Sequence, residues 1–234
     1  MSTLLVIDSG NSRIKWALAD RSELGPIAAV NREASLAPLQ EAAEGAGPVP
    51  AVGCDVAGAS QRRKIEQAVS RPCRWIDAAA TNTAGVRSRY RSGQLGADRW
   101  CALLGLRQRH GWGIAVTAGT AITVDFLAED GVFHGGLILP GRRLMHEALA
   151  AATALPAVAA DADMAEPLST EAAIAAGSLH AAAGAVRAFA QQHQVAETRI
   201  FLCGGSANSL ALLLPESNLD LQLVLRGIVV AAAD

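Results

Sequence analysis

The chain opens with a mainly apolar run at residues 3–7, and a polar turn from Asp8 to Asn11 follows it. A short apolar run closed by glycine and asparagine is typical of a buried strand that ends in a tight turn. Residues 13–18 then alternate between polar and apolar side chains, as expected of a strand with one buried face. The pattern therefore predicts two antiparallel strands joined by the turn.

Extended and helical patterns alternate through the rest of the first half. They predict a variable third strand, a helix over 36–46, a strand over 48–53, a helix around 61–69 and a strand at 74–76. A longer helix is predicted from Asp98 to Arg109, because apolar residues recur there at helical spacing and Gly111 supplies a C-terminal stop. Short strands mixed with helices indicate an α/β protein.

The pattern of the first residues recurs after residue 111. A strand at 113–116 enters Thr117-Ala118-Gly119-Thr120-Ala121 and continues into a second strand at 122–127. A shift of 109 residues places Gly10 on Gly119 and Asn11 on Thr120. Each copy is a strand, a glycine turn and a second strand, so the chain contains an internal repeat.

The second copy continues with a third strand, two helices and a further strand, over 132–139, 142–152, 170–192 and 199–203, and a last helix and strand complete the chain. We therefore expect two halves, residues 1–111 and residues 112–234, with the boundary near Gly111. A chain of 234 residues has room for one large domain or for two modest ones.

Composition narrows the class of protein. Hydrophobic residues make up 51% of the chain and charged residues 18%, which indicates a compact mixture of helix and sheet. The formal net charge of −2 gives no basic field for nucleic acid or for an anionic membrane surface, so the expected partners are small molecules. The apolar stretches at the N-terminus and at 148–160 are too short for a signal peptide or a membrane span, and a cytoplasmic protein is expected.

The cysteines and histidines give no sign of a metal centre. The four cysteines and five histidines are scattered without the close spacing that metal ligands show. Buried free thiols are the expected state of the cysteines, and no structural metal is predicted.

The two glycine turns are candidates for phosphate binding. A glycine between two strands lets the main chain approach a phosphate closely, and neighbouring Asn, Ser or Thr side chains can donate hydrogen bonds to its oxygens. One such turn by itself is more often an ordinary hairpin. A hairpin has no reason to recur at the start of both halves, whereas an ATP site between two halves needs one clamp from each. The turns beginning at Asp8 and Thr117 are therefore predicted to bind ATP.

Asp8 and Thr117 occupy equivalent places in the two turns but differ in charge. A carboxylate beneath the phosphates can hold Mg²⁺ through water, which makes Asp8 a candidate magnesium residue; the alternative is a capped turn. Thr117 cannot supply a charge. The two turns are therefore expected to have unequal roles.

A third group of candidate residues, Gly96-Ala97-Asp98-Arg99, stands at the start of a predicted helix and follows Tyr90. Asp98 can accept a proton from an attacking hydroxyl, and Arg99 can neutralise a carboxylate or a phosphate with its planar guanidinium. An aspartate at a helix N-terminus is also a common cap. Phosphoryl transfer chiefly needs positioning and charge compensation, so an acid beside an arginine, together with two phosphate turns, indicates a base and a clamp.

Taken together, these motifs resemble type III pantothenate kinases, the family that also contains the Bvg accessory factors, over nearly the whole chain. Residues 8–15 are similar to the first ATP loop of that family, residues 96–99 to its substrate motif, and residues 117–121 with Thr123 and Asp125 to its second phosphate loop. Residues 169–177 resemble its threonine-bearing helix start, and Cys203-Gly204-Gly205 resembles its late diglycine turn near the adenosine side.

The resemblance implies an α/β fold of the actin-like and Hsp70-like (ASKHA) kinase type, made of two duplicated ribonuclease H-like halves. It also implies a homodimer that uses ATP and Mg²⁺ to phosphorylate pantothenate to 4′-phosphopantothenate, the first step of coenzyme A biosynthesis. Asp98 would accept the proton of the pantothenate hydroxyl.

The resemblance also implies which residues contact each substrate. Those expected at pantothenate are Tyr90, Gly96, Ala97, Asp98, Arg99 and Thr170, the last reachable from the neighbouring subunit. Those expected at ATP are Asp8, Ser9, Gly10, Asn11, Ser12, Arg13, Ile14, Lys15 and Thr120.

The sequence departs from the family at Thr117, where most members have an aspartate that helps to hold potassium or ammonium. Three outcomes are open: independence of potassium, compensation by another oxygen such as that of Asp125 or a backbone carbonyl, or loss of activity. Our hypothesis is that binding of the monovalent cation is weakened but not abolished.

Two other functions compete with a pantothenate kinase. One is a kinase of the same fold for another small hydroxylated substrate, since phosphate loops alone do not select the acceptor. The other is a non-catalytic nucleotide-binding regulator, suggested by the accessory-factor name and by Thr117. Intact Asp98 and Arg99 argue against loss of catalysis, and the acidic charge balance argues against direct transcription control.

Overall fold

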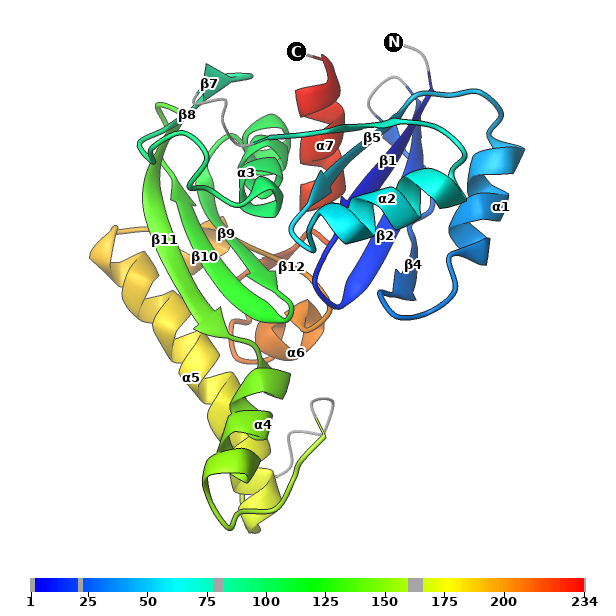
Figure 1. The fold of residues 1–234 in the computed structure, drawn as a ribbon. Coiled ribbons are helices and arrows are strands. Elements are labelled where there is room, and N and C mark those ends of the chain that lie inside the picture. The colour runs from blue at the N-terminus through cyan, green and yellow to red at the C-terminus, as the bar shows by residue number, and fades with distance from the viewer. Residues whose placement is uncertain (1–2, 21–22, 78–81, 160–165, 234) are drawn as a thin grey trace. The chain divides into compact units, whose positions relative to one another are not determined.

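The computed structural model describes residues 3–20, 23–77, 82–159 and 166–233, which form two compact units (Figure 1). The first unit comprises Met1–Trp112, Leu127–Gly135 and Gln222–Asp234, and the second comprises Gly113–Phe126 and Gly136–Leu221. The first change of unit falls beside the expected boundary at Gly111, whereas two later segments return to the first unit. The division into duplicated halves, 1–111 and 112–234, stays a prediction from the repeat.

The first unit contains a sheet in which β1 (Leu4–Ser9) lies between two long neighbours. β2 (Arg13–Asp20) pairs antiparallel with β1, which confirms the predicted hairpin, and β5 (Ala51–Asp55) pairs parallel with β1 on its other side. The sheet is completed by β3 (Glu23–Leu24), β4 (Ala28–Asn31) and β6 (Cys73–Trp75). The turn that follows β1 is therefore supported from both neighbouring strands.

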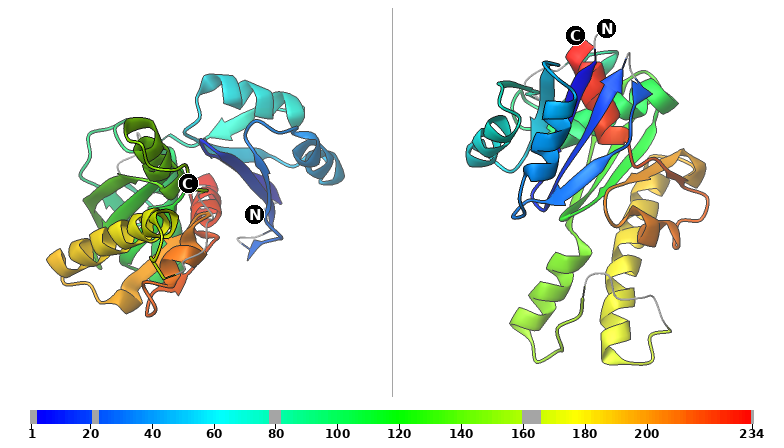
Figure 2. Two further views of the ribbon diagram at one scale, coloured as in Figure 1. Left: turned by 90° about the horizontal axis from the view of Figure 1, so that it is seen from below. Right: turned by 90° about the vertical axis from the view of Figure 1, so that its right-hand side faces the viewer.

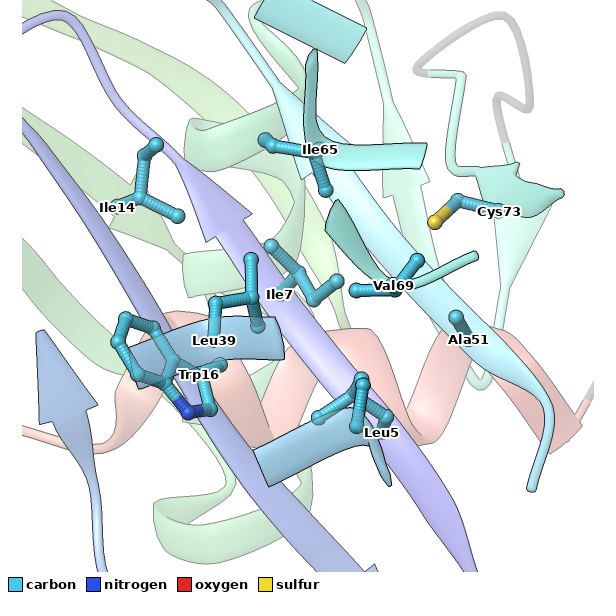
Figure 3. Packing of buried hydrophobic residues seen from close by; sticks show 10 residues of the cluster. Leu5, Ile7, Ile14, Trp16, Leu39, Ala51, Ile65, Val69 and Cys73 are labelled. Carbon is cyan, nitrogen blue, oxygen red and sulfur yellow. The ribbon is translucent and has the colours of Figure 1, made fainter. Parts of the chain in front are cut away.

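Helices α1 (Ala37–Gly45) and α2 (Ala59–Ala68) cover one face of this sheet. Leu5 and Ile7 of β1 pack there with Leu39 of α1 and Ile65 of α2 in a cluster of buried side chains (Figure 3). Burial of each side chain of this size stabilises a fold by about 1.5 to 3 kcal/mol, so the cluster fixes β1 firmly against the two helices. Alternate residues of a strand point to opposite faces, which leaves Val6 and Asp8 for the other side.

The C-terminal segment is a helix that was not predicted. It follows a short helix, Ala207–Ala211, and a short strand, Asn218–Leu219, which agree with the last helix and strand expected from the sequence. α7 (Leu223–Ala233) packs along α3 (Ala97–His110) and contacts β1 and β5. A Cβ on Gly227 would clash with the carbonyl oxygen of Cys101, so this glycine lets the two helices approach closely. An apolar run satisfies a buried strand and a buried helix equally well, and only the packing against α3 decides between them.

Two short strands of the first unit are additional to the predicted elements, β7 (Asn82–Thr83) and β8 (Val86–Ser88). They pair with each other, and β8 also lies parallel to the start of β11 (Val132–Pro140), where Phe133 is the partner of Ser88. This pairing brings the chain just before Tyr90 next to Phe133.

The second unit confirms the repeated strand, turn and strand, as β9 (Gly113–Ala118) and β10 (Ala121–Leu127) are neighbours. β12 (Ile200–Cys203) lies parallel to β9, and β13 (Asn218–Leu219) lies parallel to β12. Helices α4 (Arg142–Ala152) and α5 (Thr170–Gln192) run next to each other (Figure 2). The remaining elements are the 3-10 turn η1 (Glu197–Arg199) and helix α6 (Ala207–Ala211).

Candidate active site

The first loop, residues 8–15, is the hairpin between β1 and β2. The N–H of Gly10 donates to the carbonyl of Arg13 at 3.0 Å, which closes the turn. A Cβ on Gly10 would lie 3.1 Å from that carbonyl oxygen, so the turn has little space for a side chain. Asn11, Ser12 and Arg13 are exposed. The turn therefore presents its main chain and three polar side chains to a ligand.

Asp8 lies at the base of this loop and is only 7% exposed. Lys15 is its cross-strand partner, and the Nζ of Lys15 lies 3.6 Å from Asp8 Oδ2. The thiol of Cys54, the neighbour of Asp8 on β5, donates to Oδ1 at a distance of 3.6 Å. Asp8 is therefore held from both neighbouring strands.

The charge of Asp8 is costly in this position. Burial is the main cause that raises the pKa of Asp8; the charge of Lys15 lowers it, and the charge of Asp98 raises it further. The two carboxylates of the first unit are therefore close enough for their charges to interact. A buried acid whose proton affinity is raised by a neighbouring carboxylate is a common feature of catalytic sites.

Two residues of the first loop turn their side chains away from the surface. The Ser9 hydroxyl is buried and donates to Asp55 Oδ1 at 2.6 Å. The Ile14 side chain is buried in the core cluster. Of the residues expected at ATP, these two can offer a ligand only their main chains.

Asp98 lies in the first turn of α3, where Gly96 is the N-cap residue and provides no side-chain cap. Asp98 Oδ1 accepts the N–H of Arg99 at 2.8 Å, so the carboxylate also satisfies one free donor of the helix start. Burial raises the pKa of Asp98, while the bond from the Arg99 N–H and the charge of Arg99 lower it. A Cβ on Gly96 would lie 2.7 Å from Asp98 Oδ1, so the glycine leaves room for the carboxylate.

Arg99 is held by two aromatic rings. Its guanidinium carbon lies 5.6 Å from the ring centre of Tyr90 and 5.8 Å from that of Phe133, and the two rings are 5.2 Å apart. Cation–π contacts of this kind orient an arginine that is only 6% exposed. The structure thus brings together Tyr90, Asp98 and Arg99, as expected, and adds Phe133.

Sequence reasoning missed Phe133 because its neighbours in the site are distant along the chain. No local motif marks it; only the pairing of β8 with β11 places it beside Tyr90. Cys54 and Asp55 were also missed, although a signal existed. Both follow the predicted strand at 48–53, and the ends of parallel strands commonly carry site residues.

The second loop, residues 117–121, is held by main-chain contacts within the second unit. The N–H of Gly119 donates to the carbonyl of Ala121 at 3.0 Å, and that of Gly141 donates to Thr120 at 2.9 Å. A Cβ on Gly141 would clash with the carbonyl of Gly119, and one on Gly204 with the carbonyl of Ala118. Two separate glycine segments therefore pack directly against this loop.

Thr117 occupies the position equivalent to Asp8, and its side chain contacts a thiol. Its hydroxyl lies 3.2 Å from the thiol of Cys203 on β12. Asp125 is 1% exposed and Thr123 is 7% exposed, and both belong to β10. The expected cation position thus has a hydroxyl beside a thiol, where Asp8 has a carboxylate beside an amine.

Thr170 is the first residue of α5 and is exposed. Ser169 is the N-cap residue and accepts the N–H of Ala172 at 3.1 Å, which fixes the start of the helix. Thr170 lines an apolar groove between α4 and α5 in the second unit.

Comparison with known proteins identifies the family. The sequence model of the type III pantothenate kinases matches residues 4–192. A type III pantothenate kinase of Aromatoleum aromaticum is 42% identical over 241 aligned positions, which cover 99% of this chain and 98% of that protein.

Solved structures support the fold. A putative Baf family transcriptional activator from Campylobacter jejuni is similar with a TM-score of 0.58 at 19% identity, over 98% of this chain and 97% of that one. Component A of the 2-hydroxyglutaryl-CoA dehydratase from Acidaminococcus fermentans gives a TM-score of 0.59 at 12% identity, over 99% and 96% of the two chains. The fold is of the actin-like (ASKHA) kinase type, as expected. Because the family model matches most of the chain and a member of the family is 42% identical over 99% of it, the chain belongs to the type III pantothenate kinase family.

Proposed function

We propose that this chain transfers the terminal phosphoryl group of ATP to the hydroxyl of pantothenate, with Asp98 as the proton acceptor. The observation that carries the proposal is the arrangement around Asp98. The Asp98 carboxylate stands at the start of α3, beside Arg99, which two aromatic rings hold in place. The charge of Asp98 also raises the pKa of a second buried carboxylate, Asp8. The family supplies the acceptor, pantothenate, and the product, 4′-phosphopantothenate, the first intermediate on the way to coenzyme A.

Asp98 acts as the general base. As the pantothenate oxygen attacks phosphorus, its proton passes to the Asp98 carboxylate. Burial raises the pKa of Asp98, which makes the carboxylate a better proton acceptor than an exposed aspartate. The contact with the Arg99 N–H fixes Oδ1 and leaves the other oxygen for the substrate.

Arg99, Tyr90 and the start of α3 hold pantothenate. The guanidinium offers a planar pair of donors to the carboxylate of the acceptor, and the rings of Tyr90 and Phe133 prevent it from rotating away. Gly96 and Ala97 are partly exposed and offer main-chain groups beside Asp98. Positioning of this kind accounts for much of the rate of phosphoryl transfer.

The first loop binds the phosphates of ATP through the main chain around Gly10 and the side chains of Asn11, Ser12, Arg13 and Lys15. Thr120 of the second loop is a separate candidate contact for ATP. Within the described residues, no three His, Cys, Asp or Glu side chains gather as a metal site. Mg²⁺ that arrives with ATP needs only one or two protein carboxylates, and the carboxylate of Asp8 fits that requirement. When bound, Mg²⁺ neutralises charge on the phosphates.

We propose that binding of potassium or ammonium at Thr117 is weakened relative to a site with a carboxylate there. Monovalent cations bind through oxygen donors and gain from a negative charge. The Thr117 hydroxyl is engaged with the Cys203 thiol, which contributes no charge. Thr117 therefore adds one neutral oxygen at most.

We further propose a homodimer formed through the apolar groove between α4 and α5, whose volume is about 700 Å³. Residues that line it include Leu144, Met145, Ala148, Leu149, Leu155 and Thr170. Leu149 and Leu155 are 39% and 38% exposed, so the groove leaves apolar surface for a partner. By length and composition α5 would also pass as a membrane span, but half of its most apolar window is buried in the protein, as in a core helix. A second copy that covers this groove would bury its exposed apolar side chains. It would also explain how Thr170 can reach a site of the neighbouring subunit.

Light scattering on a size-exclusion column tests the dimer. The unaltered chain is expected to have the mass of two copies, and Leu149→Lys is expected to reduce it to one. Leu212→Lys, at a residue that is 68% exposed and does not line the groove, is the matched control and should leave the mass unchanged. A monomeric native chain, or association only with lipid vesicles, would contradict the dimer.

The site also supports a cytoplasmic location, where ATP is available, and small-molecule partners in place of nucleic acid or membrane.

The decisive test of function is ATP-dependent phosphorylation of pantothenate by the native chain and by Asp98→Asn. The variant is expected to lose about 10²-fold to 10⁴-fold in kcat, the range for loss of a general base. Equal turnover in both would remove Asp98 from the mechanism. Activity in neither would favour a non-catalytic nucleotide-binding protein, and activity with another hydroxylated acid alone would favour a different kinase.

A further inference from the structure

We propose that Asp55 is a positioning residue for the first loop and acts through Ser9. The inference rests on the proposed role of that loop in binding ATP. Asp55 is the last residue of β5, and its side chain is 1% exposed. Its register partner on the parallel strand is Ser9, the last residue of β1 and the one directly before Gly10.

The contact between the two side chains is short and buried. Ser9 Oγ donates to Asp55 Oδ1 at 2.6 Å, within the range of hydrogen bonds from a hydroxyl to a carboxylate. The main chains are also linked, because the N–H of Val56 donates to the carbonyl of Ser9 at 3.0 Å. Ser9 is therefore fixed to the end of β5 by its side chain and by its main chain.

Asp55 is itself anchored by three further donors. Oδ1 also accepts the N–H of Ala57 at 3.2 Å, and Oδ2 accepts the N–H of Gly58 at 3.0 Å and the Nε of Arg62 at 3.0 Å. Gly58 is the N-cap residue of α2, so the carboxylate joins the start of that helix to the end of β1. Four donors fill the acceptor positions that a carboxylate offers.

Two consequences follow for the chemistry of the site. With its acceptor positions filled by protein donors, Asp55 is not a ligand for magnesium or a contact for substrate. The Ser9 hydroxyl donates its one hydrogen bond to Asp55, so it cannot also donate one to a phosphate. The function of the pair is therefore to hold the main chain at Ser9 and Gly10, where the turn closes through Gly10 and Arg13.

The support is matched on the opposite face of the sheet. Cys54 precedes Asp55 and donates to Asp8, whereas Asp55 accepts from Ser9. Since consecutive strand residues point to opposite faces, the end of β5 holds the base of the first loop from both sides. Loss of the contact between Asp55 and Ser9 would loosen the loop on the face opposite Asp8. The affinity for ATP should therefore fall, and the KM for pantothenate should not change.

Direct measurement of ATP affinity by titration calorimetry, with steady-state KM values for both substrates, tests this inference. Ser9→Ala removes the bridging hydroxyl alone and is expected to weaken ATP binding about 3-fold to 10-fold, the range for one lost hydrogen bond. Asp55→Asn should weaken it by at least as much, because its amide places donors against donors. In both variants the KM for pantothenate should stay unchanged, and the double variant should be no weaker than Asp55→Asn.

Arg62→Gln is the matched control, because it breaks the outer contact of Asp55 and leaves Ser9 in place. Its ATP affinity should equal that of the native chain. Ser9→Ala with native ATP affinity and a lowered unfolding temperature would overturn the inference, and so would additive losses in the double variant or an equal loss in Arg62→Gln. If Asp55→Asn does not fold, Ser9→Ala decides alone. A native chain that does not bind ATP would instead contradict the proposed function.

Discussion

The two loops that we propose as phosphate-binding loops each contain a glycine turn between neighbouring strands, but different interactions support them. The first loop is built on charge and on side chains: Asp8 contacts Lys15 and Cys54. The second loop is built on main-chain packing, in which Gly141 and Gly204 leave no room for a Cβ. At the position equivalent to Asp8, the Thr117 hydroxyl contacts the thiol of Cys203. The two turns thus share a shape but differ in their supports, and the first has a carboxylate, Asp8, where the second has the hydroxyl of Thr117.

The largest expected effect separates the loops by charge. Asp8→Asn keeps the shape of the first loop and removes its carboxylate, so kcat should fall about 100-fold, as for the loss of one electrostatic group at a phosphoryl-transfer site. Steady-state kinetics at several magnesium concentrations measure the loss. Asp20→Asn, at the exposed end of β2, is the control and should retain full activity. Native kinetics in Asp8→Asn would show that the charge of the first loop does not contribute to catalysis.

A second prediction tests the main-chain support of the second loop. Gly204 has a φ of +93°, and a Cβ there would clash with Ala118, so Gly204→Ala should lower the free energy of unfolding by about 2 kcal/mol or more. Denaturant unfolding measures this. Gly184→Ala, in α5 with open space around it, should instead raise the free energy of unfolding by about 0.5 to 1 kcal/mol. Equal responses at the two glycines would show that the loop does not depend on close packing.

A third prediction concerns pH, because burial raises the pKa of both Asp8 and Asp98. Their protonated forms stabilise the fold; this stability is fully present below the unfolded pKa of about 3.9 and is lost as the pH rises through the folded pKa. Asparagine stays neutral, so Asp98→Asn should be more stable than the native chain at neutral pH. The advantage should shrink toward acid pH. Thermal unfolding at a series of pH values checks the sign, and a constant difference would contradict it.

The smallest effect is expected at Thr117. Thr117→Val removes the contact with Cys203 and should cost about 0.5 to 1.5 kcal/mol of stability. If the Thr117 oxygen retains weak cation binding, the variant should also lose whatever activation potassium gives to the native enzyme, measured against sodium at equal ionic strength. Strong potassium activation that survives in Thr117→Val would place the cation at other oxygens.

Local sequence patterns predicted much of the fold because they record local constraints. The glycine turns at Gly10 and Gly119 and the helix after Gly96 follow from steric demands within a few residues, and each is present in the structure. The final helix was not among the predicted elements, since residues 223–233 are apolar except for Arg226 and only contact with α3 selects the helix. The same holds for the candidate site. Asp8, Asp98 and Arg99 belong to local sequence motifs and were predicted, whereas Phe133 and Asp55 belong to none and were missed.

The sequence by itself determined the family, the repeated glycine turns and the charged residues beside them, because these depend on residue type and short spacing. Tertiary structure decided what surrounds each charge. It placed Phe133 on Arg99, gave Asp8 a thiol and an amine as neighbours, and turned Ser9 from a possible phosphate donor into a support held by Asp55. These roles depend on strand register and burial, which join residues far apart in the chain and leave no trace in the local pattern.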